Sequence, residues 1–124
     1  MNGKFLLDTN AVVALLRSNA TLIQTLQSAE WVGVSVITEL EFLSFSGLSP
    51  RDESVFQEFK NRVDVIDLQS SDNKMLMRII EIRKQNNLKL PDAIIAASAI
   101  ENNATLLTQD ADFSRIALLS VQDF

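Results

Sequence analysis

The sequence predicts an α/β fold in which a central, mostly parallel and twisted sheet is flanked by helices on both faces. Short apolar runs alternate along the chain with amphipathic stretches, which is the pattern of strands alternating with helices. Only three Gly and two Pro occur among 124 residues, and no segment has the composition of a linker or a repeat. We therefore expect one domain over residues 1–124, which is an ordinary length for a single hydrophobic core.

The first part of the chain predicts two strands, each followed by helices. Residues 4–7 form an apolar run that ends at a carboxylate and indicates the first strand, whereas residues 10–17 and 20–28 carry apolar side chains at helical spacing. A short second strand is expected over residues 31–35. Ser35, its last residue, has a side chain suited to cap a helix over residues 36–45.

The remaining elements continue this alternation after a break at Gly47 to Pro50. They are a helix over residues 52–61, a strand over 63–68, a long helix over 71–85, a helix over 91–102, a buried strand over 105–108 and an edge strand over 117–121. Pro91 occupies a favoured first helical position. Alternation of apolar residues with acids indicates the strand that begins at residue 63.

The composition excludes several chemistries. Cysteine, histidine and tyrosine are missing, which rules out disulfides, thiolate or imidazole metal sites, and catalytic triads with a histidine base. The formal net charge of −5 argues against broad affinity for nucleic acid, although cations bound to clustered acids would cancel part of it. No apolar run reaches the length of a membrane span and no signal peptide is recognisable, so a cytoplasmic protein without membrane contact is expected.

Two acidic residues follow predicted strands. Asp8 ends the first apolar run, and Asp110 follows the buried strand over residues 105–108. Ligands of open α/β sheets bind beyond the carboxyl ends of the strands, which favours a functional role. The plainer interpretation is that Asp8 caps a helix and Asp110 lies in an ordinary turn. Asp112 either assists the same site or caps the segment before Phe113.

Asp92 opens a helix in an unexpectedly apolar position. Ile95, Ala96 and Ala99 follow it at the spacing of one helix face, so Asp92 heads the buried stripe of that helix. A carboxylate there costs free energy unless it is paired or bound to a metal. The structural alternative is an acid that favours the first turn because of the helix dipole.

The helix over residues 36–45 offers two further acids. Glu39 and Glu41 point in different directions on a helix, and the pattern alone does not choose between them. Thr38 and Glu41 also have the spacing of a capping box, which would make Glu41 structural.

These acids predict a metal site. Carboxylates that converge from separate elements repel one another unless a cation neutralises them, and all-oxygen ligands suit Mg²⁺ or Mn²⁺. The candidate metal ligands and catalytic residues are Asp8, Glu41, Asp92 and Asp110, with Glu39 and Asp112 as further candidates. Metal-dependent hydrolysis of phosphodiester bonds is the activity that this set favours.

Four ordered segments resemble the motifs of PIN-domain nucleases. Residues 6–10 resemble the first motif, and residues 35–41 resemble the second, where Glu41 fits the spacing better than Glu39. Residues 90–97 and 106–113 match the third and fourth motifs, which carry Asp92 and Asp110. The sequence departs from the pattern at Gln109, where relatives often have Asn.

The chain length further resembles the VapC-type toxins of toxin–antitoxin pairs. The resemblance implies a PIN-like fold and a Mg²⁺- or Mn²⁺-dependent endoribonuclease that cleaves RNA, is silenced by a cognate antitoxin and is often a homodimer. Asp8 would then be the central ligand, with hydrogen bonds from Thr108 and Asn10 supporting the ligand cluster.

Two other functions fit parts of the pattern. A noncatalytic α/β binding module would use the acids only as caps and turn residues. A receiver-like phosphoacceptor would need an acidic pair near Asp8 and a lysine near Asp110, and the sequence has neither. Arg83, Lys84 and Lys89 form the densest basic cluster, which is either a solvated helix end or a contact for phosphates beside the site.

Overall fold

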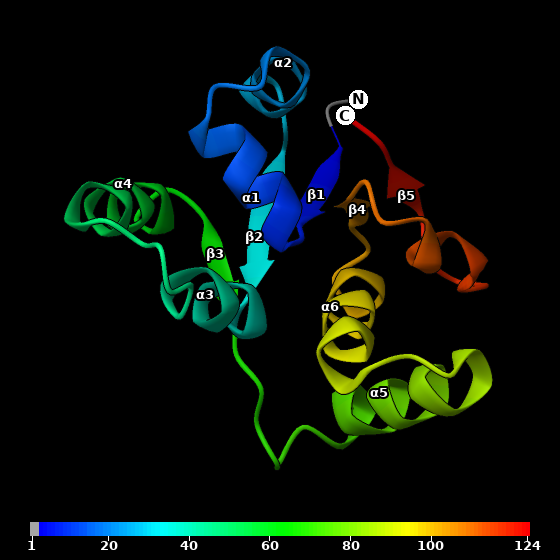
Figure 1. Cartoon of the computed structure of the whole chain (residues 1–124). Coiled ribbons are helices and arrows are strands. Elements are labelled where there is room, and N and C mark those ends of the chain that lie inside the picture. Colours follow the sequence, from blue (N-terminus) through cyan, green and yellow to red (C-terminus); the bar gives the residue numbers. More distant parts are fainter. Residues whose placement is uncertain (1–2) are drawn as a thin grey trace.

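A computed structural model describes residues 3–124, in which five strands form one sheet (Figure 1). The strands are β1 (Lys4–Leu7), β2 (Trp31–Ser35), β3 (Asp64–Ile66), β4 (Thr105–Leu107) and β5 (Val121–Gln122). Their order is β3-β2-β1-β4-β5, and each neighbouring pair is parallel. The predicted α/β class with a parallel sheet is confirmed.

Helices connect these strands in the described residues. They are α1 (Thr9–Leu16), α2 (Ala20–Gln27), α3 (Val36–Leu43), α4 (Pro50–Lys60), α5 (Asn73–Asn86), α6 (Leu90–Glu101) and the 3₁₀ helix η1 (Ala111–Arg115). Within residues 3–124, no helix has both the length and the hydropathy needed to cross a membrane.

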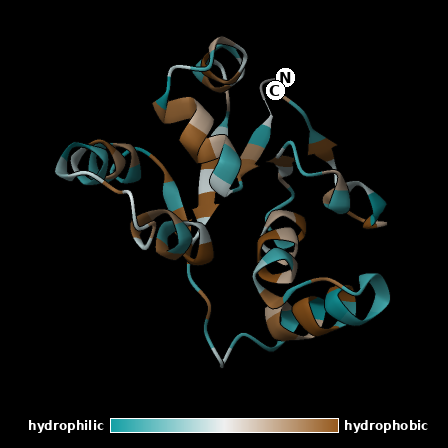
Figure 2. Cartoon of the chain, in the orientation of Figure 1, coloured by the Kyte–Doolittle hydropathy of each residue, from teal (hydrophilic) through white to brown (hydrophobic). Residues whose placement is uncertain are grey.

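The core has two layers, one on each face of the sheet. Leu6 and Leu106 are fully buried against α5 and α6, whereas the next residues, Leu7 and Leu107, are fully buried on the side of α1, α2 and α4. Successive side chains of a strand point to opposite faces, which explains this division. Figure 1 shows these helix groups on opposite sides of the strands, and Figure 2 shows the strands as mainly apolar segments between them.

The topology creates a crevice between β1 and β4. From β1 the chain proceeds to β2 and β3 on one side, then crosses back to β4 and β5 on the other. The connections that follow β1 and β4 therefore diverge, and ligands bind at such a switch point, beyond the carboxyl ends of the strands. Asp8 follows β1 and Thr108 follows β4, so both residues lie at this crevice.

Helices α3 and α6 are fixed beside the crevice by different means. Ser35 caps α3 by accepting a hydrogen bond from the backbone N–H of Ile37, and the ring of Phe42 stacks on Phe56 of α4 at a centroid distance of 4.8 Å. Helix α6 instead presents small side chains to the sheet. Its fully buried alanines are Ala93, Ala96, Ala97 and Ala99.

The predicted last strand over residues 117–121 is wrong. Residues 111–115 form η1, and pairing with β4 begins only at Val121. Phe113 and Ile116 are buried, with exposed fractions of 2% and 4%, so they hold this segment in a compact turn instead of an extended strand. The edge position that was predicted for the last strand is correct.

Other element boundaries also differ from expectation by one or two residues, and two of them have a clear physical reason. The third strand ends at Ile66 instead of continuing to residue 68, and Leu68 is 41% exposed. The fourth helix begins at Pro50, two residues early, because Ser49 and Asp52 form a reciprocal capping box in front of it.

Candidate active site and metal centre

A pocket of about 370 Å³ opens at the crevice between β1 and β4. Its walls come from the first turn of α1, the second half of α3, the start of α6 and the segment after β4, which surround the centre of the view in Figure 1. The lining residues are Asp8, Thr9, Asn10, Val13, Glu41, Asp92, Ile95, Asp110 and Phe113. The fold therefore brings four of the predicted site acids into one pocket.

Asp8 is both a helix cap and a pocket residue. Its side chain is buried, with 4% of the residue exposed, and its Oδ1 accepts a hydrogen bond of 2.9 Å from the backbone N–H of Ala11. The other oxygen, Oδ2, accepts a hydrogen bond from the hydroxyl of Thr108. The capping and functional interpretations are therefore compatible, because the cap holds the carboxylate at the pocket wall.

Thr108 links Asp8 to Asp110. The Thr108 hydroxyl that donates to Asp8 also accepts a hydrogen bond of 3.0 Å from the backbone N–H of Asp110. Asn10 makes a longer connection, because its Oδ1 accepts from the backbone N–H of Gln109 at 3.5 Å. Both residues that were expected to support the cluster thus join the start of α1 to the segment after β4.

The pocket is electrostatically unfavourable for several negative charges. Burial raises the pKa of Asp8 to about 6, and the charges of Asp110 and Asp92 also act to raise it. The pKa of Asp92 is likewise raised, first by burial and then by the charges of Asp110 and Glu41. Burial and neighbouring charges therefore disfavour the ionised forms of Asp8 and Asp92, which is the situation that a bound divalent cation relieves.

The two glutamates of α3 have different neighbours. Glu41 lines the pocket, and its Oε1 accepts a hydrogen bond of 2.6 Å from the Thr9 hydroxyl. Glu39 faces α4, where its Oε2 lies 2.7 Å from the ammonium group of Lys60. Only Glu41 therefore projects toward the other acids.

The capping-box interpretation of Glu41 is wrong. Helix α3 begins at Val36 with Ser35 as its cap, so Thr38 lies inside the helix and is not its first capping residue. Sequence reasoning also missed the role of Thr9, which holds Glu41 from the neighbouring helix. The signal for it was weak, because a hydroxyl beside a strand-end aspartate has many local uses.

Asp110 and Asp112 also differ in their position relative to the pocket. Asp110 lines the pocket, and its Oδ1 accepts a hydrogen bond of 2.9 Å from the backbone N–H of Asp112. Through this bond Asp110 caps η1. The side chain of Asp112 is exposed and is not part of the pocket wall, although its charge contributes to the raised pKa of Asp92.

The donor set of the pocket fits a hard divalent cation. The polar side chains that line it offer carboxylate, hydroxyl and amide oxygens, which are the ligands that Mg²⁺ and Mn²⁺ prefer. Within residues 3–124, no three acidic side chains are already gathered around one point. A single shared ion would therefore have to draw at least some of these carboxylates closer together.

The fold and this pocket agree with the result of comparison with known families. A model of the PIN domain matches residues 5–119. The chain therefore belongs to the PIN-domain family, as its four motifs predicted. A relative from Mycobacterium tuberculosis, named ribonuclease VapC51, is 32% identical, and the alignment covers 96% of this chain and 89% of the relative.

Solved structures show the same fold. A toxin–antitoxin complex from Klebsiella pneumoniae contains a chain that is 26% identical, with a TM-score of 0.74 and coverage of 92% of this chain and 93% of that one. VapBC2 from Rickettsia felis, bound to a DNA fragment from its promoter, has a TM-score of 0.84 at 24% identity and covers 98% of both chains.

Proposed function

We propose that this PIN-domain protein is a Mg²⁺- or Mn²⁺-dependent endoribonuclease and the toxin of a toxin–antitoxin pair, with residues 1–124 forming one domain. One observation carries the proposal. Four carboxylates from separate segments line a single pocket at the switch point of the sheet. The 32% identity to a protein named as a ribonuclease supports RNA as the substrate.

The pocket acids would act together as ligands. Asp8, Glu41, Asp92 and Asp110 would hold one or two divalent ions, with Asp8 as the central ligand. A bound Mg²⁺ or Mn²⁺ ion would neutralise charge on the phosphodiester and lower the pKa of a water molecule, so that hydroxide would be available to attack the phosphorus at neutral pH. Glu39 is a weaker candidate because Lys60 already pairs with it, and Asp112 is weaker because it lies outside the pocket wall.

The residues of the chain supply orientation and a proton acceptor. Thr108 fixes Asp8, and Thr9 fixes Glu41, so the oxygens that face the pocket are held before the substrate arrives. Because the sequence contains no histidine, either a pocket carboxylate or hydroxide bound to the metal would accept the proton of the attacking water.

Cleavage of single-stranded RNA by purified protein tests the proposal. The wild type should cut the RNA with Mn²⁺ and lose this activity with excess chelator, and Asp8→Asn should abolish cleavage at matched folding by circular dichroism. Glu81→Gln, which removes an exposed carboxylate on α5, is the control and should cleave normally. Full activity of Asp8→Asn would exclude the proposed role of Asp8.

The proposal includes a cognate antitoxin in the cytoplasm. The structures from Klebsiella pneumoniae and Rickettsia felis are described as a toxin–antitoxin complex and as VapBC2. This chain has a groove of about 430 Å³ with mainly apolar walls from α1, α2 and α4, which suits an apolar segment of a partner. Expression of this protein should arrest growth. Co-expression with the product of an adjacent small reading frame should relieve that arrest and give a stable complex.

A homodimer is also part of the proposal. Met77 and Ile80 of α5 are 60% and 45% exposed, which leaves apolar surface available for a second copy. Sedimentation velocity of the isolated protein should therefore give the mass of two chains.

A further inference from the structure

Phe45 is unusual among the aromatic residues. It is 66% exposed, whereas the other aromatic residues, all within residues 3–124, are buried or half-buried. The residue follows α3, where Ser44 ends the helix. A large apolar ring that faces water adds little to the core, and its face is free to contact a molecule outside the folded chain.

The ring of Phe45 rests on the backbone of Gly47. A Cβ atom at position 47 would lie 2.7 Å from Cε2 of the ring and 3.3 Å from Cζ, so only glycine leaves room for this arrangement. A hydrogen bond of 3.1 Å from the Leu48 N–H to the Phe45 carbonyl closes the turn beneath it. One side of the ring is thus supported while most of the residue remains open to solvent.

Phe45 comes directly after α3, the helix that brings Glu41 to the wall of the acidic pocket. It follows Glu41 by four residues, and the hydrogen bond from its N–H to the Phe42 carbonyl continues the turn of α3 beyond the helix end. Phe45 is therefore about one turn further along the chain than Glu41, just past the end of the helix and outside the set of residues that line the pocket. On the other wall, Lys89 is the first capping residue of α6 and stands one turn before Asp92.

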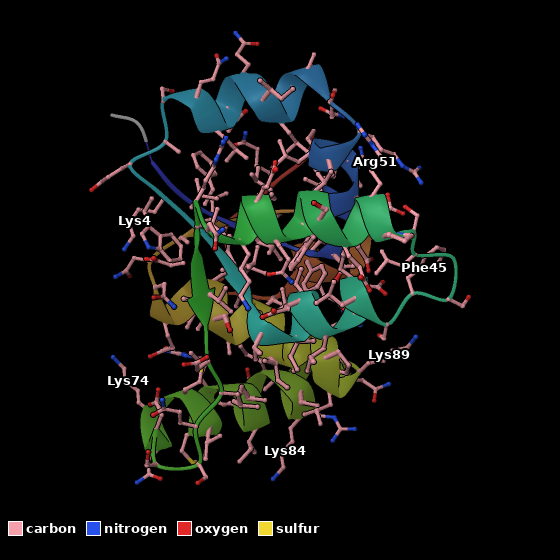
Figure 3. The ribbon with its side chains drawn as sticks, turned by 90° about the vertical axis from the view of Figure 1, so that its left-hand side faces the viewer. Lys4, Phe45, Arg51, Lys74, Lys84 and Lys89 are labelled. Carbon is pink, nitrogen blue, oxygen red and sulfur yellow. The ribbon has the colours of Figure 1, made fainter. Side chains whose placement is uncertain are left out.

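Lys89 has a charge available for a ligand. It makes no ion pair with any residue of the described range 3–124. Figure 3 shows Phe45 and Lys89 at the same edge of the molecule, where they project from the segment after α3 and from the start of α6. An exposed aromatic ring thus follows Glu41 by four residues, and an ammonium group without an ion pair precedes Asp92 by three.

The net charge of −5 makes a stacking contact especially useful. Electrostatic affinity for RNA requires clustered cations, which this chain lacks overall. Stacking of a base on an aromatic ring needs no net charge and accepts any base that is not paired.

We propose, on the basis of the proposed endoribonuclease activity, that Phe45 is a stacking platform for an unpaired base next to the cleaved phosphate and that Lys89 contacts a neighbouring phosphate. The substrate class is accordingly RNA that is single-stranded at the cleavage site. A paired base has both faces covered by its neighbours in the helix and cannot occupy the platform.

Steady-state cleavage of a short, fluorescently labelled single-stranded RNA tests this subsite. Phe45→Ala should raise KM by about 5- to 100-fold and change kcat much less, because stacking is lost without touching the metal ligands. Phe45→Trp should restore KM. Gly47→Ala keeps the aromatic ring but displaces it, so KM should rise there too while the melting temperature stays unchanged.

Matched controls separate stacking from general effects. Leu118→Ala removes an apolar side chain from a residue that is also 66% exposed, and it should leave KM unchanged. Lys89→Ala should reduce the slope of log KM against log salt by about 0.7, the value for one phosphate contact on a single strand. Arg51→Ala removes an exposed cation of α4, outside the basic cluster that contains Lys89, and should leave the slope unchanged.

RNAs with one base removed identify the stacked nucleotide. At one position beside the cleaved bond, loss of the base should raise KM for the wild type and have no further effect in Phe45→Ala. Equal effects of base removal in both proteins would overturn the proposal, as would an unchanged KM in Phe45→Ala. A KM change that accompanies loss of a dimer in sedimentation would assign Phe45 to a protein contact instead. A wild type that cleaves no RNA would refute the endoribonuclease proposal itself.

Discussion

Two hydroxyl groups hold two of the pocket carboxylates. Thr108 donates to Asp8 within the buried part of the pocket, and Thr9 donates to Glu41 near the surface. Hydrogen bonds to a carboxylate fix its rotamer and favour its ionised form. The raised pKa of Asp8 shows that burial outweighs this effect.

The raised pKa predicts a pH-dependent stability difference between Asp8→Asn and the wild type. Folding raises the pKa of Asp8 from 3.8 to about 6, so the folded state binds the proton more tightly, and ionisation destabilises it as the pH rises through this range. The unfolding free energy of Asp8→Asn relative to wild type should therefore increase across that range by on the order of 3 kcal/mol and then stay constant.

Urea unfolding with a chelator present, at a series of pH values, measures this difference. Asp112→Asn is the matched control, because its side chain is exposed and should give no comparable trend. A constant difference between Asp8→Asn and wild type at all pH values would show that burial does not disfavour the ionised form of Asp8.

Loss of the hydrogen bond from Thr9 to Glu41 should affect catalysis less than loss of a pocket carboxylate. Thr9→Val keeps the shape of the side chain but removes the donor to Glu41, so kcat/KM should fall about 2- to 10-fold, as expected for one hydrogen bond. Thr9→Ser should restore it. Thr21→Val on α2 is the control for an exposed threonine. Equal activity of Thr9→Val and wild type would mean that Glu41 needs no positioning.

At the scale of elements, the orientation of α3 decides which glutamate enters the pocket. Phe42 is buried against Phe56 of α4, and this contact fixes the rotation of the helix about its axis. Glu41 then faces α1 and Glu39 faces Lys60. The sequence left both residues open because the choice depends on packing between helices that are distant in the chain.

The two glutamates should therefore respond differently to substitution. Glu41→Gln should lose most RNA cleavage without loss of stability. Glu39→Gln should keep wild-type cleavage and lose at most about 1 kcal/mol of stability, since it breaks only a partly exposed ion pair. Cleavage rates and urea midpoints measure both outcomes. Loss of cleavage in Glu39→Gln, together with full activity in Glu41→Gln, would reverse the assignment.

The alanines of α6 set the distance between Asp92 and the other acids. Ala96 is fully buried, so Ala96→Leu should overpack the helix against the sheet and cost about 1–3 kcal/mol of stability. Cleavage should fall as well, because α6 carries Asp92. Ala117→Leu, at an exposed position, should change neither quantity. Chemical denaturation that finds Ala96→Leu as stable as wild type would contradict this packing.

For the whole molecule, sequence patterns predicted the architecture and the acids that line the pocket, because both follow from local rules. Apolar runs that end at Asp8 and near Asp110 indicated strands with a functional edge, and the small residues after Asp92 indicated a closely packed helix. Contacts between remote segments could not be predicted in the same way. The pairing of Thr9 with Glu41 and the burial of Phe113 depend on how helices and turns pack in three dimensions.

The position of the pocket depends on the complete topology. Asp8 and Asp110 meet because β1 and β4 are parallel neighbours, although about a hundred residues separate them in the chain. The acids of α3 and α6 join them from helices next to this crevice. No single segment therefore contains the site, and the site exists only in the folded domain.

Anomalous scattering from crystals grown with Mn²⁺ provides the most direct measurement. The proposed function predicts a manganese peak inside the pocket, coordinated by Asp8 and by at least one carboxylate from another segment. Strong peaks only at other surfaces, with the four side chains unchanged and directed away from one another, would show that distant oxygens do not share a cation here.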